Sequence, residues 1–197
     1  SGKTWENALP IGNGRLGAMV YGNVEKETLQ LNEHTLWTGG PNRNDNPLAL
    51  DSLATIRQLI FEGKQKKAEE IASRVIITKK SHGQMFQPVG SLQLSFDGHE
   101  NYTNYYRELD IEKAVTKTSY SIGNVSYTRE AFASFPDRVI VMRLTSDKPG
   151  TISFAATFTT RQAKAVVNTT VAKELTIAGT TADHEGVKGL VKFKGIV

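Results

Sequence analysis

The chain has 197 residues, 39% of them hydrophobic and 22% charged, a composition typical of one globular domain or of most of one. Its net charge is +4, but the lysines and arginines are spread out, which argues against a nucleic-acid interface, and no run of 18 apolar residues could span a membrane. Because there are no cysteines, disulfides, thiol chemistry and cysteine-ligated zinc are excluded.

Residues 5–47 are dense in glycine, asparagine and proline, yet they hold both tryptophans of the chain. They include a literal G-x-G-x-x-G at Gly12, Gly14 and Gly17. A dinucleotide loop needs a strand before these glycines and a helix after them, whereas here AMVYGN follows, with β-type residues and a turn. We therefore expect a β-hairpin that reverses at Gly22-Asn23, not a Rossmann fold.

The segment 32–42 is the candidate binding loop. A glycine-rich loop with one indole and several polar groups could hold a sugar, because the ring stacks on the indole and the hydroxyls bond to polar side chains. Alternatively, the tryptophan anchors the packing and the polar groups are satisfied at the rim. The residues proposed to line a substrate pocket or a domain interface are Asn32, Glu33, His34, Trp37, Gly39, Gly40 and Asn42.

Residues 48–76 break the strand pattern and predict an αα-hairpin. Apolar residues recur on one helical face in each half, first at Leu53, Ile56, Leu59 and Ile60 and then at Ala68, Ile71, Ala72 and Val75. Asn46 is the expected cap, with Pro47 at the first helical position and Gly63 ending the first helix. The mixed charges of the polar face favour a docked hairpin over a membrane-surface element.

Residues 78–90 are expected to form a loop. It contains His82, which together with His34 suggests a metal pair only weakly, because the two lack ligand spacing. We predict no metal and no cofactor.

From Ser91 onward the pattern is that of β-strands joined by turns. Ala114, Thr116, Thr118, Tyr120 and Ile122 are expected to share one face of a strand, and turns are expected at Gly123-Asn124 and Pro136-Asp137. Residues 160–172 are polar and are expected to form a long loop, with strands following around Leu175 and Val191. The predicted fold is mainly β: an antiparallel two-sheet β-sandwich with the inserted αα-hairpin.

Four blocks carry a resemblance to a known family: WENALPIGNGRLGAMVYGNVEKETLQLNEHTLWTGGPNRNDNP, QPVGSLQLSF, YYRELDIEKAVTKTSYSIGNVSYTREAFASFPDRVIVMRL and EGVKGLVKF. Together they cover nearly the whole chain, and they resemble the N-terminal domain of glycoside hydrolase family 95, the α-L-fucosidase family. The resemblance implies a β-sandwich of the super-sandwich type. It also implies that residues 1–197 form the N-terminal domain of a larger exo-glycosidase. Because the strand pattern stops at Val197 without a turn, we expect the domain to be cut before its last strands.

The carboxyl groups of the chain do not single out a catalytic pair. Glu6, Glu33, Asp45, Glu108, Asp110 and Glu130 are the candidate acids, and their spacing favours none. We expect Glu108 and Asp110 to form surface ion pairs with Arg107 and Arg129. The resemblance implies that the catalytic groups sit in a separate C-terminal (α/α)₆ barrel, so no catalytic residue is assigned here.

Three functions remain open. The first is a non-catalytic domain, inactive alone, of an enzyme that hydrolyses terminal α-L-fucosyl or α-L-galactosyl linkages with inversion, packed on its barrel and shaping the pocket for a fucosylated glycan. The second is a stand-alone carbohydrate-binding module that uses Tyr102, Tyr105 and Tyr106; the third is a purely structural domain. A family 65-type phosphorylase is an alternative parent enzyme. The absence of cysteines fits a bacterial protein, and the resemblance implies that it is periplasmic or secreted.

Overall fold

The computed structural model describes residues 2–41, 43, 45–78, 83–170 and 174–197. The chain divides into two compact units. The larger unit comprises Ser1–Leu36, Phe86–Thr181 and Lys192–Val197, and the smaller comprises Trp37–Met85 and Ala182–Val191.

A five-stranded antiparallel sheet forms one layer of the larger unit, in the order β1-β2-β3-β4-β9. The predicted hairpin is confirmed, because β2 pairs with β3 and places Val20 opposite Leu29. A short 3₁₀ helix, Trp5–Asn7, precedes the sheet, and the G-x-G-x-x-G glycines lie in and between two strands, as the rejection of a Rossmann fold requires. The strands are β1 Leu9–Gly12, β2 Leu16–Val20, β3 Lys26–Glu33, β4 Gly90–Ser95 and β9 Ala155–Thr159.

A four-stranded sheet of consecutive hairpins forms the second layer, in the order β5-β6-β7-β8. Thr116, Thr118 and Tyr120 alternate as its buried residues along β6, as the period of two predicts, and Ile122 is partly buried. Ala114, expected on the same face, precedes the strand and is exposed. The strands are β5 Thr103–Asp110, β6 Val115–Ile122, β7 Val125–Ser134 and β8 Val139–Ser146.

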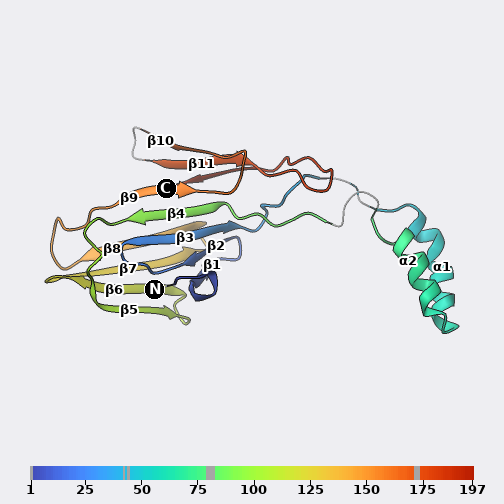
Figure 1. The fold of residues 1–197 in the computed structure, drawn as a ribbon, viewed down its shortest axis with the longest axis horizontal. Coiled ribbons are helices and arrows are strands. Elements are labelled where there is room, and N and C mark those ends of the chain that lie inside the picture. Colours follow the sequence, from blue (N-terminus) through green and yellow to red (C-terminus); the bar gives the residue numbers. More distant parts are fainter. Residues whose placement is uncertain (1, 42, 44, 79–82, 171–173) are drawn as a thin grey trace. The chain divides into compact units, whose positions relative to one another are not determined.

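The two sheets pack face to face, with β1 and β2 of the first against β6, β7 and β8 of the second. In Figure 1 strands β7 and β8 overlap β1 and β2 in the view. Side chains such as Leu29, Leu92 and Phe158 from one layer meet Ala131 and Met142 from the other in a single hydrophobic cluster. This burial is what holds antiparallel sheets together as a sandwich. The predicted fold class is therefore confirmed.

A third sheet, in the order β10-β11-β12, extends the larger unit and buries Leu175 and Ile177 in the same cluster. Its strands are β10 Val166–Thr169, β11 Leu175–Thr180 and β12 Lys192–Ile196. The prediction of one long loop over 160–172 is wrong at β10. All four side chains of β10 are exposed, so the strand exists through its backbone pairing with β11 and leaves no apolar alternation in the sequence.

The smaller unit contains the predicted αα-hairpin, α1 Leu48–Phe61 and α2 Gln65–Val75. Gly63 ends α1 as expected: its φ is +71°, its N–H donates to the Ile60 carbonyl, and the Lys64 N–H donates to the Leu59 carbonyl. The start lies one residue later than predicted, because Pro47 occupies the capping position. Asn46 still accepts a hydrogen bond from the Leu48 N–H, at 3.2 Å.

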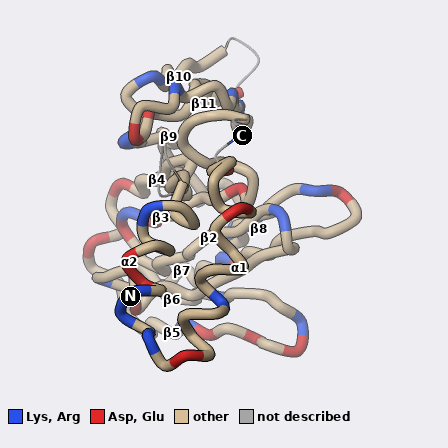
Figure 2. Tube along the Cα trace, turned by 90° about the vertical axis from the view of Figure 1, so that its right-hand side faces the viewer, with Lys and Arg blue, Asp and Glu red and all other residues tan. Residues whose placement is uncertain are grey.

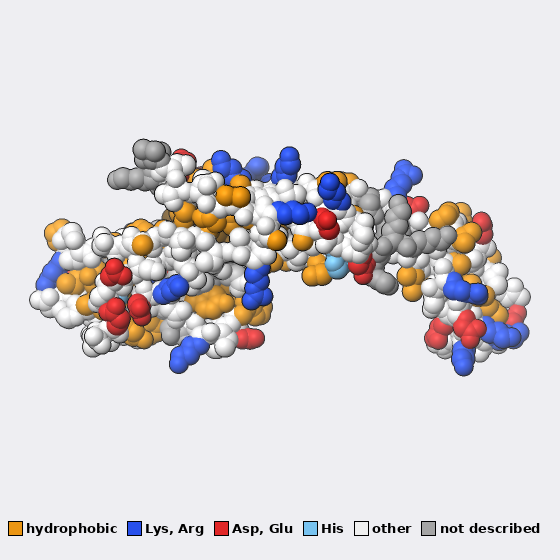
Figure 3. Space-filling view, turned by 45° about the horizontal axis from the view of Figure 1, so that its top comes forward, with side chains coloured by type: hydrophobic (Ala, Val, Ile, Leu, Met, Phe, Trp, Pro, Cys, Tyr) orange, Lys and Arg blue, Asp and Glu red, His pale blue; other side chains and the backbone are white. Residues whose placement is uncertain are grey.

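The hairpin leaves much of its apolar surface uncovered. Leu50 and Phe61 are 79% and 88% exposed, whereas only Ile56 and Ala68 of the two helices are buried. Hydrophobic side chains show among the charged ones on its surface (Figure 3). No helix in the described part of the chain is both long and apolar enough to cross a membrane. Lysines and arginines are interspersed with acidic residues along the trace (Figure 2).

Candidate functional site

The residues proposed as a binding loop are divided between the two units. Asn32 and Glu33 end β3 and His34 follows them in the larger unit, whereas Trp37, Gly39 and Gly40 belong to the smaller one. Asn42 lies outside the described residues. The prediction that these residues line one pocket therefore stays a prediction.

Glu33 is the centre of a local polar cluster in the larger unit. Its carboxylate accepts hydrogen bonds from the Thr35 N–H at 2.8 Å and hydroxyl at 2.5 Å, and from Arg15 Nε at 2.9 Å. His34 Nδ1 lies 3.5 Å from the same carboxylate. Partial burial opposes ionisation, but the bonds from Thr35 and Arg15 outweigh it and lower the pKa of Glu33. Glu33 is therefore an acceptor, poorly suited to donate a proton.

Trp37 is 44% exposed, so its indole is not sealed in a core. The next residue, Thr38, is buried: its hydroxyl donates to Gln84 Oε1 at 3.0 Å and accepts from the Met85 N–H at 2.8 Å. The loop is therefore fastened immediately beside an accessible aromatic ring. This arrangement suits a contact surface, because the ring needs little further ordering to pack on a partner.

The glycines after Trp37 have a packing reason of their own. Gly39 has a φ of +67°, and a Cβ there would stand 2.4 Å from Gln84 Oε1. A Cβ at Gly40 would stand 2.9 Å from Leu190 Cδ1. The Leu190 N–H also donates to the Gly39 carbonyl, at 2.8 Å. The segments that contain Gln84 and Leu190 thus come so close to the backbone at Gly39 and Gly40 that packing alone requires glycine at both positions.

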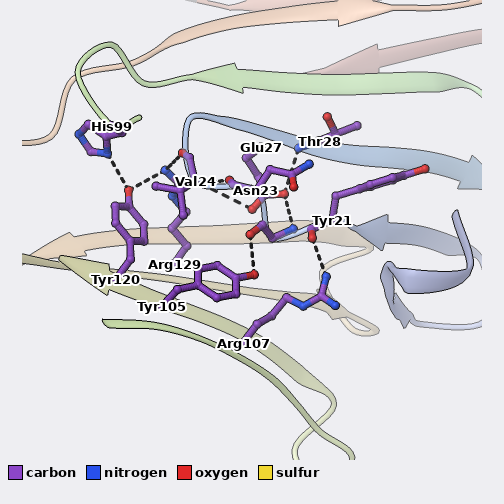
Figure 4. Close-up of polar contacts among 11 residues, drawn as sticks. Tyr21, Asn23, Val24, Glu27, Thr28, His99, Tyr105, Arg107, Tyr120 and Arg129 are labelled. Carbon is purple, nitrogen blue, oxygen red and sulfur yellow. Dashed lines mark hydrogen bonds and ion pairs between the residues drawn. The ribbon is translucent and has the colours of Figure 1, made fainter. Parts of the chain in front are cut away.

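A buried polar network in the larger unit was not predicted (Figure 4). Arg129 of β7 is 3% exposed, and its guanidinium donates to the carbonyls of Asn23 at 2.7 Å and Val24 at 2.6 Å, and to the Tyr120 hydroxyl at 2.6 Å. Glu27 of β3, fully buried, accepts from the Gly22 N–H at 2.7 Å. The two side chains from opposite sheets together hold the turn between β2 and β3.

Burial dominates the ionisation of this network. It raises the pKa of Glu27, against the opposing pull of the Arg129 charge and of backbone N–H donors, and it lowers the pKa of Arg129. Burial, with the positive charge of Arg129 second, also lowers the pKa of His99, whose Nδ1 lies 2.9 Å from the Tyr120 hydroxyl. These groups are interior, so the network is structural.

The expected surface ion pairs on β5 are not formed. Arg129 is interior, and Arg107 donates to the backbone carbonyls of Tyr21 at 2.6 Å and Asn7 at 2.8 Å. Asp110 pairs with Lys113 instead, at 2.9 Å. A signal was available in the sequence: the period of two places Arg129 on the same face of β7 as the buried Tyr127 and Ala131.

The three tyrosines considered as a stacking platform do not form one flat surface. The rings of Tyr102 and Tyr105 are inclined by 54° with centroids 5.7 Å apart. Tyr105 is half-buried and donates its hydroxyl to the Gly22 carbonyl at 2.8 Å. Among the described residues no cluster of three or more histidine, aspartate or glutamate side chains is placed to hold a metal, and His82 lies outside them.

Comparison with known proteins identifies the family. Residues 1–197 match the family model described as "Glycosyl hydrolase family 65, N-terminal domain". The chain belongs to this family.

Curated relatives of this family 65 N-terminal domain are named as fucosidases. The chain is 44% identical over 159 residues to "Alpha-L-fucosidase 2" of Arabidopsis thaliana, a match that covers 79% of the chain and 18% of the relative. It is 33% and 31% identical to proteins named "Probable alpha-fucosidase A" of Aspergillus niger and Aspergillus oryzae, over 71% and 73% of the chain and 18% and 20% of those relatives. The chain thus spans about a fifth of the length of the curated relatives it matches.

Proposed function

We propose that the chain is the N-terminal, non-catalytic domain of a family 95-type α-L-fucosidase that hydrolyses terminal α-L-fucosyl or α-L-galactosyl linkages with inversion. The observation that carries this proposal is the 44% identity to a protein named alpha-L-fucosidase 2, over 79% of this chain. The resemblance of its sequence blocks to family 95 points the same way. A location outside the bacterial cytoplasm belongs to the same proposal.

The ionisation of the described carboxyl groups supports a non-catalytic role. An inverting glycosidase needs a carboxylic acid with a raised pKa and a second carboxylate roughly 6.5–9.5 Å away. Hydrogen bonds lower the pKa of Glu33, despite partial burial, and that of Asp110. Among the described carboxyl groups with a resolved shift, only Glu27 has a raised pKa, and its side chain is fully buried, out of reach of a sugar.

The partner in this proposal is a C-terminal (α/α)₆ barrel of the same polypeptide. The relatives are about five times longer than the matched region. A polypeptide of their length would contain a further domain large enough to cover the exposed apolar residues of the helical hairpin. Leu50 and Phe61 are the residues we expect such a domain to bury. The loop with Trp37 is proposed to shape one side of its pocket.

The test compares the 197-residue chain with a polypeptide extended to the length of the relatives. Both are incubated with an oligosaccharide that ends in an α-L-fucosyl residue, with and without phosphate. We expect free L-fucose, released first as the inverted anomer, from the long polypeptide only. The proposal would be contradicted if the 197-residue chain released L-fucose, or if neither polypeptide released it.

A second candidate follows from the description of the matched family. Family 65 includes phosphorylases, so the chain could instead precede a barrel that transfers a glycosyl group to phosphate. The same assay separates the two, since a phosphorylase releases a sugar phosphate and requires phosphate for turnover.

A further inference from the structure

Two turns of the larger unit line an open, solvent-accessible cavity of about 320 Å³. One turn connects β1 to β2 and contributes Asn13 and Arg15; the other connects β7 to β8 and contributes Phe135, Pro136 and Arg138. The volume is at the lower end of the range for small-molecule sites, roughly 300–1,000 Å³. A cavity of this size suits a single sugar ring. Neither the proposed function nor the buried network uses this cavity.

The walls of the cavity are held in place by the side chain of Asn13. Its amide N–H donates to the Ser134 carbonyl at 2.7 Å, across 121 positions of sequence. Its Oδ1 accepts from the N–H groups of Arg15 at 3.1 Å and Leu16 at 2.7 Å. The second turn is closed by the Ser134 hydroxyl, which donates to Asp137 at 2.6 Å. The two turns are thus fixed relative to each other before any ligand arrives.

The charge of the lining is positive. Among the residues that the structure describes, both ionisable ones that line the cavity are arginines and none is acidic. Arg15 uses its Nε on Glu33, whereas the Arg138 guanidinium makes no hydrogen bond or ion pair within the described part of the chain. Arg138 also has a φ of +57°, a conformation uncommon for a residue other than glycine.

The remaining lining is apolar. Phe135 is 77% exposed, and the exposed Pro136 lies next to it. An aromatic ring beside a proline offers a surface for the C–H face of a sugar, while a guanidinium offers paired donors to an oxyanion. The cavity therefore combines the two features that an acidic sugar needs.

We propose that this cavity binds an acidic residue of a glycan, with a carboxylate or sulfate held by Arg138 and Arg15 and the sugar ring against Phe135. The inference takes from the proposed function only that the ligand is a glycan. It adds that the glycan recognised by this domain carries a negative charge, as in a uronic acid or a sulfated sugar.

The experiment measures binding to the 197-residue chain at low ionic strength by calorimetry or ligand-observed NMR. The probes are methyl glucuronide, glucose 6-sulfate, the uncharged methyl glucoside and inorganic sulfate. We expect at least one of the two acidic sugars to bind at least about tenfold more tightly than methyl glucoside and inorganic sulfate. The affinity of that sugar should fall as salt is added. Which of the two binds identifies the anionic group.

Two variants test the assignment to this cavity. Arg138→Asn removes the charge but keeps a residue that tolerates positive φ, and should weaken binding about tenfold or more. Arg143→Gln removes an equal charge on β8, where Arg143 pairs with Glu130, and should leave binding unchanged. Phe135 is 77% exposed, so Phe135→Ser should leave folding unchanged. It should weaken the binding of the acidic sugar but not the binding of inorganic sulfate.

Three results would overturn the inference: acidic sugars that bind no better than methyl glucoside, binding that survives Arg138→Asn, or inorganic sulfate that binds as tightly as both acidic sugars. Because the assay records binding to this chain and not the release of fucose, its failure is separate from a failure of the proposed function.

Discussion

The guanidinium of Arg129 lies 3.8 Å from the carboxylate of Glu27 between the two sheets of the sandwich, with side chains 3% and 0% exposed. Each charge comes from a different sheet, and each also bonds to the backbone of the turn between β2 and β3. Arg129 in this way connects the turn between β2 and β3 to the four-stranded sheet.

Replacing Arg129 by methionine should destabilise the chain strongly. Glu27 would remain buried without its partner, a situation that costs about 3–5 kcal/mol of unfolding free energy. Urea unfolding measures the loss. Arg143→Gln, which breaks an exposed pair, should cost less than about 1 kcal/mol. The double variant Glu27→Gln, Arg129→Met should recover part of the loss. With Glu27→Gln alone completing the cycle, a double-variant loss equal to the sum of the two single losses would show that the pair carries no coupling.

The stability of the chain should depend on pH through His99. Its pKa is lowered in the folded state, mainly by burial, so between that pKa and the unfolded value near 6.5 the unfolded state binds the proton more tightly. The unfolding free energy should therefore fall as pH is lowered below about 6.5, by up to about 1.4 kcal/mol per pH unit. Urea unfolding at several pH values measures this slope. His99→Asn, which retains a polar group near the Tyr120 hydroxyl, should flatten it, and an unchanged slope would assign it to other groups.

Gly39→Ala should destabilise the smaller unit. The new Cβ would meet Gln84 Oε1 at 2.4 Å, and the backbone is already at a φ of +67°. Gly63→Ala is the matched control, because Gly63 has a φ of +71° and no atom within 4 Å of the added Cβ. Both variants should lose about 1 kcal/mol from the backbone conformation, and Gly39→Ala should lose more. Equal losses by thermal unfolding would mean that Gln84 moves away without cost.

Trp37→Ala, made in a polypeptide extended to the length of the relatives, tests whether the loop reaches the substrate. If the indole stacks on a sugar, KM should rise about two- to tenfold, the equivalent of about 0.5–1.5 kcal/mol, with the unfolding free energy unchanged. Trp5→Ala is the control, since Trp5 is the other tryptophan and is 56% exposed. Unchanged KM and kcat in Trp37→Ala would leave the loop without this role.

The sequence by itself determined the features that depend on neighbours along the chain. The period of two predicted strands β2, β3 and β6 and their buried faces. Gly63 predicted the end of α1, because a helix end of this kind depends only on the local backbone conformation. The family resemblance followed from blocks that span nearly the whole chain, and the family model matches residues 1–197.

Only the tertiary structure decided which polar residues meet across the fold. Strand β10 exists through pairing with β11 and not through its own pattern, and Arg129 is interior because Glu27 and the carbonyls of Asn23 and Val24 compensate its charge there. The cavity depends on a hydrogen bond between residues 121 positions apart. The period of two places Arg129 on the inward face of β7, but it does not identify the partners that Arg129 meets there, because those contacts form only when both layers are assembled.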